Sequence, residues 1–279
     1  MAHSLVLMTT TLVTGATGNV GRHTVAQLVR DGHEVRALSR NPGRAELPGA
    51  VQVKGDLTDP ASLAPALDGV EAVQLITFAG NEPLSEPASA AIVEQLRAAG
   101  VRRVTVLSGG GDTPLQTAVQ RSDLEWTVLV PVEFMSGALD WADSIRDEGV
   151  VRAGFVERRS AMVHDADIGA VGAAVLARGG YGGRALPITG PEVLTPPDMV
   201  RIVGEAIGRQ IRLVPLTEDE AREQWRKEGF PDEVVDFFVW AHGSTPEIGY
   251  TVTPTVEQVT GRPARTLAEW ARENADRFR

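Results

Sequence analysis

Three glycines in the segment TGATGNVG, residues 14–21, have the spacing of a turn that binds a dinucleotide. Gly15, Gly18 and Gly21 come directly after an apolar run typical of a strand and before a stretch typical of a helix. Such glycines allow a tight turn, a close approach of the backbone to the pyrophosphate, and close packing of helix against strand. The diphosphate then lies on the unpaired N–H groups at the helix N-terminus. The predicted cofactor contacts in this turn are Gly15, Thr17, Gly18, Asn19, Val20 and Gly21.

The residues at the end of the second predicted strand favour NADP(H) over NAD(H). A free ribose 2′-hydroxyl is usually met by an acidic residue at this place, whereas a 2′-phosphate calls for arginine. No Asp or Glu occupies residues 37–40, and Arg40 and Arg44 supply two cations. The alternative is that Arg40 is a solvated surface charge.

Asp56 and Leu57 follow the third predicted strand, in the segment GDLTD, and we expect both to contact the cofactor. The Asp56 carboxylate could accept a hydrogen bond from the adenine amino group. It could equally be a turn aspartate or the N-cap of a helix, since aspartate is favoured at such positions.

Composition excludes several classes of function. The chain has 279 residues, a formal net charge of −10 and no cysteine. Scattered basic residues in an acidic chain argue against a nucleic-acid partner, and no apolar run reaches the ~18 residues of a membrane-spanning helix. The histidines show no metal-ligand spacing and no thiolate is available, so we expect no metal. The N-terminal apolar run leads into the glycine turn rather than a cleavage site, which favours a cytoplasmic protein. We expect it to be a monomer or a homodimer.

Strands alternate with helices over the first 130 residues, which predicts a parallel sheet covered on both faces. The predicted strands are 5–13, 34–38, 51–54, 72–76, 103–107, 127–130, 184–188 and 212–214. The predicted helices are 20–30, 61–67, 87–99, 113–121, 136–145, 165–176, 197–207, 218–227, 232–241 and 267–278.

The fold class is therefore α/β, a Rossmann-type doubly wound parallel sheet with a smaller, mostly helical C-terminal substrate lobe. We expect an NAD(P)-binding domain over residues 1–150 and the substrate lobe over residues 151–279, with some segments interleaved with the sheet. Substrate is expected between the two, above the C-terminal ends of the strands, where sheets of this kind hold their ligands.

Several segments in a fixed order resemble one family. They are TGATGNVG, ALSRNPGRA, GDLTDPASLAPALDGVEAVQLIT, SDLEWTVLVPVEFM and the terminal GRPARTLAEWA. Over nearly the whole chain these segments resemble the NmrA-like group of atypical short-chain dehydrogenase/reductases. The resemblance implies a Rossmann domain that binds NADP(H) and a small C-terminal substrate lobe. It leaves the activity open, because the group contains both enzymes and non-catalytic sensors.

The same resemblance implies that the ends of the fourth, fifth and sixth strands line the nicotinamide pocket. The implied cofactor contacts there are Ile76, Thr77, Phe78, Ser108 and Pro131. The expected substrate contacts are Gly109, Gly110, Glu133, Phe134 and Trp141. Trp141 is one of several large aromatic residues of the second lobe that would suit a polycyclic aromatic ligand. Packing alone is the alternative for Phe78, Pro131 and Phe134, and a flexible loop is the alternative for the glycines.

The usual proton donor of the family is missing. In the standard pattern Tyr-x-x-x-Lys, the lysine lowers the tyrosine pKa and holds the nicotinamide ribose. The only tyrosines are Tyr181 and Tyr250 and the only lysines are Lys54 and Lys227, so neither tyrosine has a lysine four residues on. Hydride transfer remains possible, because positioning contributes several kcal/mol while a general acid typically adds only ~10²–10⁴-fold. The absence favours an electron-poor conjugated carbonyl, or a substrate whose own phenol supplies the proton.

Two residues are candidates for catalysis. Ser108 matches the family serine, whose hydroxyl could bond to the carbonyl, and a strand-end cap is the alternative. His164, in MVHDADIG, precedes a helix that Asp165 or Asp167 would cap, and it is a candidate proton donor with a structural role as the alternative. Glu133 would need a raised pKa to donate a proton.

Together these residues predict an NADPH-dependent reductase of a conjugated carbonyl, either a polycyclic aromatic ketone or a quinone. The arginine-for-lysine bias and the missing Tyr–Lys pair resemble actinobacterial ketoreductases that tailor aromatic polyketides, which implies a role in antibiotic biosynthesis. The alternative is a non-catalytic NADP-binding redox sensor that acts through a protein partner.

Overall fold

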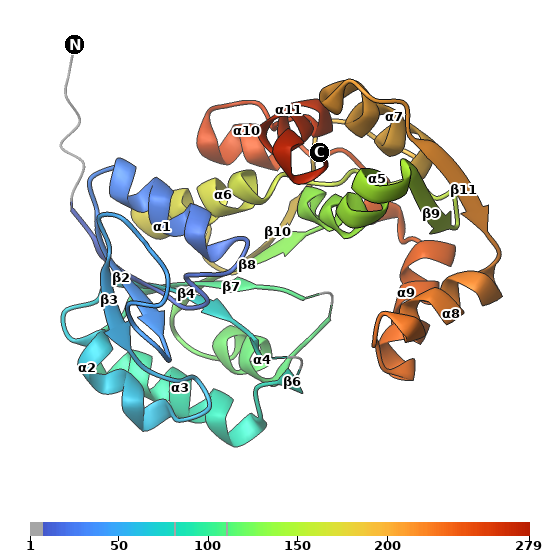
Figure 1. The fold of residues 1–279 in the computed structure, drawn as a ribbon. Helices are drawn as coiled ribbons and strands as arrows, with labels where there is room; N and C mark the ends of the chain where they lie inside the picture. The colour runs from blue at the N-terminus through green and yellow to red at the C-terminus, as the bar shows by residue number, and fades with distance from the viewer. Residues whose placement is uncertain (1–7, 81, 110) are drawn as a thin grey trace, which may run out of the picture. The chain divides into compact units, whose positions relative to one another are not determined.

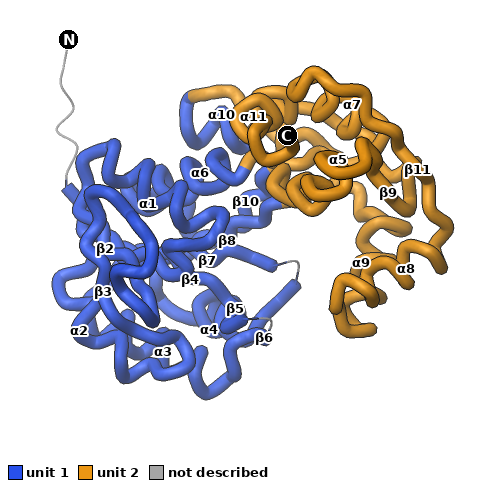
Figure 2. Tube along the Cα trace, in the orientation of Figure 1, with its two compact units in different colours: residues 1–131, 165–188, 255–261 blue, residues 132–164, 189–254, 262–279 orange. Residues whose placement is uncertain are grey.

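The structure, a computed structural model, describes residues 8–80, 82–109 and 111–279. The chain divides into two compact units, which Figure 2 shows in different colours. The segments of unit 1 are residues 1–131, 165–188 and 255–261. The segments of unit 2 are residues 132–164, 189–254 and 262–279.

The boundary expected near residue 150 differs from this division. Unit 2 begins at Val132, and residues 165–188 and 255–261 return to unit 1. The returning chain forms α6 (Asp165–Arg178) and β10 (Arg184–Ile188), and β10 pairs with a strand of the main sheet. Interleaved segments were expected, but the sequence pattern does not say which ones return, because strand pairing depends on contacts between distant segments.

Unit 1 is built on a seven-stranded sheet in which all neighbouring strands are parallel. In spatial order its strands are β10 (Arg184–Ile188), β8 (Glu125–Pro131), β7 (Arg103–Leu107), β4 (Ala72–Ile76), β1 (Thr10–Val13), β2 (Glu34–Ser39) and β3 (Val51–Lys54). The order reverses between β1 and β4, which is the switch point where doubly wound sheets bind nucleotides. The predicted fold class is confirmed.

Helices cover both faces of this sheet, as Figure 1 shows. One face carries α1 (Gly21–Arg30) and α6 (Asp165–Arg178), and α10 (Thr255–Thr260) packs on α6. The other face carries α2 (Ala64–Leu67), preceded by a 3₁₀ turn (Pro60–Leu63), α3 (Glu86–Ala98) and α4 (Pro114–Gln120). A short antiparallel pair, β5 (Phe78–Ala79) and β6 (Glu82–Pro83), follows β4.

The sequence of α1 and α6 explains their burial. Thr24, Val25 and Leu28 lie on one face of α1 at helical spacing and are buried. Eleven of the fourteen residues of α6 are buried, and they are mostly Ala, Val, Ile, Leu and Gly. A helix that is apolar nearly all round must be covered on several sides, and α6 therefore belongs to the core of unit 1.

Unit 2 is mostly helical. Its two strands, β9 (Val150–Gly154) and β11 (Arg212–Leu216), form a separate parallel pair. Its helices are α5 (Ala142–Glu148), α7 (Pro196–Ile207), α8 (Glu218–Lys227), α9 (Asp232–Gly243) and α11 (Leu267–Glu273), with 3₁₀ turns at Met135–Trp141, Glu247–Tyr250 and Ala275–Arg277.

Three of these helices begin with the same local signal. Thr195, Thr217 and Thr266 each form a capping box, in which the threonine side chain and an acidic residue three positions on bond to each other's backbone N–H groups. Because this signal is local, the starts of α7, α8 and α11 were predicted to within one residue.

Other elements differ from their predicted bounds. The first strand begins at Thr10, and the predicted residues 5–7 lie outside the described residues. The predicted helix 136–145 is a 3₁₀ turn followed by α5, and the predicted helix 267–278 ends at Glu273. The structure also contains β5, β6, β9 and α10, which were not predicted. Among the described residues, no helix has both the length and the apolar character that crossing a bilayer requires.

Candidate functional site

The glycine turn between β1 and α1 has the geometry expected of a nucleotide-binding loop. Gly15 has a φ of 59°, in the left-handed region that favours glycine, and its carbonyl accepts a 2.9 Å hydrogen bond from the Gly18 N–H. A Cβ atom added at Gly21 would lie 2.1 Å from the Gly15 carbonyl oxygen. Only glycine therefore allows α1 to start so close to the end of β1.

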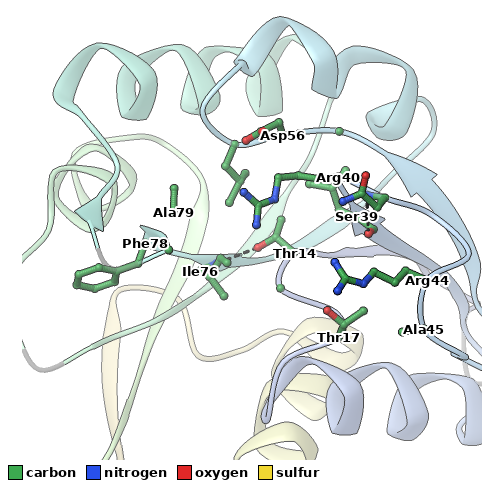
Figure 3. A pocket seen from close by; sticks show the side chains of 16 residues that line it. Thr14, Thr17, Ser39, Arg40, Arg44, Ala45, Asp56, Ile76, Phe78 and Ala79 are labelled. Carbon is green, nitrogen blue, oxygen red and sulfur yellow. Dashed lines mark hydrogen bonds between the residues drawn. The ribbon is translucent and has the colours of Figure 1, made fainter. Parts of the chain in front are cut away.

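A cavity of about 420 Å³ lies beside this turn in unit 1 (Figure 3). Its lining comes from the turn itself, from the loop that follows β2, from the start of the loop after β3, and from the segment after β4. These are the C-terminal ends of four strands, where an open parallel sheet binds its ligand. Of the predicted cofactor contacts, the following line the cavity: Gly15, Thr17, Arg40, Arg44, Asp56, Leu57, Ile76 and Phe78.

Two cations stand at this cavity without a partner. Arg40 and Arg44 are both exposed, and within the described residues neither guanidinium forms an ion pair or a side-chain hydrogen bond. Figure 3 shows both guanidinium groups directed toward the cavity, with Phe78 at the opposite end. Lys54 lines an adjoining cavity together with Arg40. Cations grouped at one end of a nucleotide cavity fit the phosphate on the adenosine ribose of NADP.

The hydrogen bonds of Asp56 are compatible both with a turn aspartate and with a contact to the adenine of the cofactor. Its Oδ1 accepts hydrogen bonds from the Thr58 N–H at 2.9 Å and from the Thr58 hydroxyl at 2.8 Å. The backbone hydrogen bond from Thr58 is the main cause that lowers the pKa of Asp56, with a smaller contribution from the Arg40 charge. The carboxylate is therefore ionised and held by its own turn while it lines the cavity.

The structure adds lining residues that were not predicted. Thr14 is buried and its Oγ1 accepts a 2.9 Å hydrogen bond from the Ile76 N–H, which ties the end of β1 to the end of β4. The others are Leu38, Ser39, Asn41, Ala45, Gly55, Ala79 and Gly80. These residues could have been predicted from their positions at or just after the end of a predicted strand, since all strands of a parallel sheet end at the same edge.

The remaining predicted cofactor contacts are placed near the cavity but do not line it. Gly18, Asn19, Val20 and Gly21 form the turn, and the Asn19 Oδ1 accepts a 2.7 Å hydrogen bond from Arg22. Thr77 is 1% exposed, and its hydroxyl has no hydrogen-bond partner among the described residues. Their contacts with a cofactor stay predictions, as does that of Pro131, which ends β8.

The end of β7 holds the predicted serine. The Ser108 N–H donates to the Leu129 carbonyl at 2.9 Å, whereas its hydroxyl makes no hydrogen bond within the described chain. A Cβ at Gly109 would lie 2.8 Å from the Phe78 ring, so the ends of β4 and β7 meet closely here. Gly110 lies outside the described residues.

Unit 2 holds the other predicted substrate and catalytic residues. Glu133 and Trp141 line a cavity of that unit, whereas Phe134 is half-buried and does not. His164 is 4% exposed, and its Nε2 lies 3.2 Å from the Glu273 carboxylate. This contact fits the structural alternative for His164, and its role as a proton donor stays a prediction.

The tyrosines and Lys227 have other partners in the structure. The Tyr250 ring carries the Arg159 guanidinium 4.1 Å from its centroid, and Lys227 pairs with Glu223 at 2.7 Å. Tyr181 accepts a hydrogen bond from Thr127 at its backbone carbonyl in unit 1. Over the residues that the structure describes, no group of His, Cys, Asp or Glu side chains has the arrangement of a metal site.

Comparison with known proteins agrees with this geometry. The family model described as NAD(P)H-binding matches residues 15–178. A (4-alkanoyl-5-oxo-2,5-dihydrofuran-3-yl)methyl phosphate reductase from Streptomyces griseus is 36% identical, with 96% of this chain and 98% of that protein aligned. An NAD(P)H azoreductase from Xenophilus azovorans is 31% identical over the same shares of the two chains. An NADPH-dependent quinone oxidoreductase from Escherichia coli, solved with NADPH, has the same fold, with a TM-score of 0.80, 22% identity, and coverage of 94% and 99%.

The prediction of a nicotinamide dinucleotide cofactor is confirmed at the level of the family. The left-handed Gly15, the space that Gly21 leaves open and the unpaired Arg40 and Arg44 all fit that cofactor. The chain therefore belongs to the NAD(P)H-binding family and, with these two relatives, to its NAD(P)H-dependent reductases.

Proposed function

We propose that this protein reduces a conjugated carbonyl, a polycyclic aromatic ketone or a quinone, with NADPH and without a Tyr-x-x-x-Lys pair. When bound, the nicotinamide supplies the hydride. Arg40 and Arg44 hold the ribose phosphate, and the Ser108 hydroxyl, which has no partner in the described chain, donates a hydrogen bond to the carbonyl oxygen of the acceptor.

The observation that supports this proposal is the absence of a Tyr-x-x-x-Lys pattern in the sequence. Tyr250 stacks with Arg159, and neither tyrosine has a lysine four positions on. Without the tyrosine and lysine of that pair, the acceptor itself must carry the charge that arrives with the hydride. A conjugated acceptor spreads that charge over several atoms, so it depends least on a general acid.

The names of the two relatives support the same class of acceptor. A 5-oxo-2,5-dihydrofuran has a ring double bond conjugated with its carbonyl, and an azoreductase acts on a conjugated N=N bond. Both are electron-poor double bonds. The proposal therefore extends to this chain the chemistry of a delocalised acceptor rather than that of a simple ketone.

The proposal includes a place in a biosynthetic reaction sequence, among the steps that modify a completed polycyclic skeleton. A reductase of this kind acts after the polycyclic skeleton has been built, and it consumes a ketone that an earlier cyclisation or oxidation supplies. Tailoring of an antibiotic, a cytoplasmic location and a monomeric or homodimeric state are parts of this proposal.

The test is a screen of NADPH consumption with product identification. We expect turnover with quinones and conjugated aromatic ketones, 1,4-naphthoquinone among them, and little or none with cyclohexanone, which cannot delocalise charge. The matched variant Ser108→Ala should lower kcat and leave the Kd of NADPH unchanged. Equal rates with saturated ketones would contradict the conjugated acceptor. Binding of NADPH without consumption by any acceptor would instead favour a redox sensor.

A further inference from the structure

A second cavity lies within unit 2, apart from the residues that line the nucleotide cavity. It has a volume of about 220 Å³ and is lined by β9, α8, α9 and the segment after β8. Four of its lining side chains are large and aromatic: Trp141, Trp225, Phe230 and Phe238. The volume is below the ~300–1,000 Å³ of a site for a drug-sized ligand, so it suits one or two fused rings.

The aromatic rings of this cavity form a connected cluster around His242. The Phe238 ring lies 6.3 Å from the imidazole with an interplanar angle of 9°, and the Trp225 ring lies 5.7 Å from it. Phe155, whose φ of 52° is in the left-handed region, places its ring 6.2 Å from the same imidazole. A non-glycine residue is strained in that region, so the packing around His242 outweighs this strain.

The cations of this cavity are already neutralised. Arg158 is 8% exposed and forms a two-pronged ion pair with Glu133, with distances of 2.6 and 2.9 Å between its nitrogens and the carboxylate oxygens. Burial would raise the pKa of Glu133, but the charge and hydrogen bonds of Arg158 outweigh it and lower that pKa. Arg152 bonds to the Glu148 carboxylate. Every arginine that lines the cavity therefore has its own carboxylate.

The remaining charges of the lining are negative. Burial raises the pKa of Asp140, and the nearby Glu228 carboxylate raises it further. An anionic ligand would meet these carboxylates without a free cation to pair with. Since buried charges require partners, a phosphate, sulfonate or carboxylate ligand is disfavoured.

His242 is a polar group of this cavity that can serve both as a donor and as an acceptor. Within the described chain its ring nitrogens make no hydrogen bond. Burial and the Arg158 charge lower the pKa of His242 to about 4, so the imidazole is neutral at physiological pH. A neutral imidazole offers one N–H donor and one nitrogen acceptor, and it can bond to a carbonyl oxygen or a phenol.

We propose that this cavity binds an uncharged, flat aromatic compound of one or two fused rings, and that the His242 imidazole forms the hydrogen bond to its phenol or carbonyl oxygen. This inference rests on the proposed function, because it names the chemical class of the acceptor. Ring stacking supplies the binding free energy and the single hydrogen bond fixes the orientation.

Calorimetric titration of the full chain without NADPH tests the cavity by itself. The probes are 2-naphthol, its 6-sulfonate, and naphthalene, which lacks the oxygen. We expect 2-naphthol to bind at least 10-fold more tightly than the sulfonate. In His242→Phe, 2-naphthol should bind about 5- to 30-fold more weakly, since a hydrogen bond contributes roughly 1–2 kcal/mol. Naphthalene should bind equally to both proteins.

Two further variants keep the test decisive. Trp225→Leu removes a lining ring and should weaken both neutral probes, whereas Trp240→Leu removes a half-exposed ring outside the lining and should not. His242→Gln keeps a donor and an acceptor and replaces His242→Phe if the latter does not fold; its loss for 2-naphthol should be smaller. Equal affinity for the sulfonate, no binding of 2-naphthol, or an unchanged Kd in His242→Phe would overturn the proposal.

Failure of this inference is distinguishable from failure of the proposed function. A cavity that binds 2-naphthol through His242 in a protein that consumes no NADPH with 1,4-naphthoquinone keeps the inference and ends the reductase proposal. Consumption of NADPH with 1,4-naphthoquinone, together with His242-independent binding of 2-naphthol, does the reverse.

Discussion

Arg40 and Arg44 bring two exposed guanidiniums to one cavity, and within the described chain neither forms an ion pair or a side-chain hydrogen bond. We expect Arg40→Ser and Arg44→Ser each to weaken NADPH binding by about 10-fold, because each removes a charge-assisted hydrogen bond of roughly 1.5 kcal/mol. The Kd of NADH, which has no 2′-phosphate, should change by less than about twofold. Titration with the two nucleotides measures this difference, and equal losses for both would place the arginines elsewhere.

His242 should make the stability of the protein depend on pH. The unfolded chain takes up a proton at His242 below its ordinary pKa of 6.5, whereas the folded protein takes it up only near pH 4. The stabilisation is therefore complete above pH 6.5 and is lost as the pH falls from 6.5 toward 4, by about 1.4 kcal/mol per pH unit. Between pH 7 and pH 5 we expect a loss of about 2 kcal/mol in the free energy of unfolding.

Urea unfolding of the wild-type protein and of His242→Gln at both pH values isolates this contribution. The buried histidines, His33 and His164, are present in both proteins and cancel in the difference. Glu133, whose pKa is lowered, titrates below this pH window. If His242→Gln loses as much stability between pH 7 and pH 5 as the wild type does, then Arg158 and the aromatic rings do not lower the pKa of the His242 imidazole as expected.

At the scale of elements, the start of α1 leaves no room for a side chain at Gly21. A Cβ there would meet the Gly15 carbonyl oxygen at 2.1 Å and the Gly15 carbonyl carbon at 2.7 Å, both of them backbone atoms. We expect Gly21→Ala to cost about 1–3 kcal/mol of stability and to abolish NADPH binding, since the turn must open to accept it. Gly111→Ala is the matched control, because a Cβ there meets nothing within 4 Å. Urea unfolding and NADPH titration of both variants measure these effects. An unchanged Kd for NADPH in Gly21→Ala would contradict the expectation that the turn must stay closed to bind the cofactor.

Elements with strong local signals were predicted and those without them were not. The capping boxes at Thr195, Thr217 and Thr266 mark three helices of unit 2. By contrast, α10 has the sequence TVEQVT, whose β-branched residues disfavour a helix, and it is helical where it packs against α6 and β10. Strand β9 has five residues and pairs with β11, about sixty residues later in the sequence. Because its partner is distant, no local sequence pattern predicts it.

At the scale of the whole molecule, unit 1 depends on residues from the second half of the sequence. Its edge strand β10 and its most buried helix, α6, come from residues 165–188. We therefore expect a fragment of residues 1–150 not to fold cooperatively, because the sheet face that α6 covers would be exposed. Circular dichroism and urea unfolding of the fragment, beside the full chain, measure this. A cooperative transition and NADPH binding by the fragment would show that residues 165–188 are dispensable.

The sequence by itself determined the sheet, the glycine turn and the charge at the cofactor site. Gly15, Gly18 and Gly21 specify the turn through local backbone sterics, and Arg40 and Arg44 follow a strand whose end is predictable. Short-range spacing carries this information, since turns, caps and alternating patterns depend on neighbouring residues.

Only the tertiary structure decided which distant residues meet. It pairs Arg158 with Glu133, surrounds His242 with rings from separate segments, and places His164 against Glu273. Of the histidines, His164 was the predicted candidate, whereas His242 lines an aromatic cavity. The spacing of residues along the chain does not predict such contacts, because a side chain becomes buried and gains charged neighbours only when the chain folds. Burial and neighbouring charges then set its pKa and with it its chemistry.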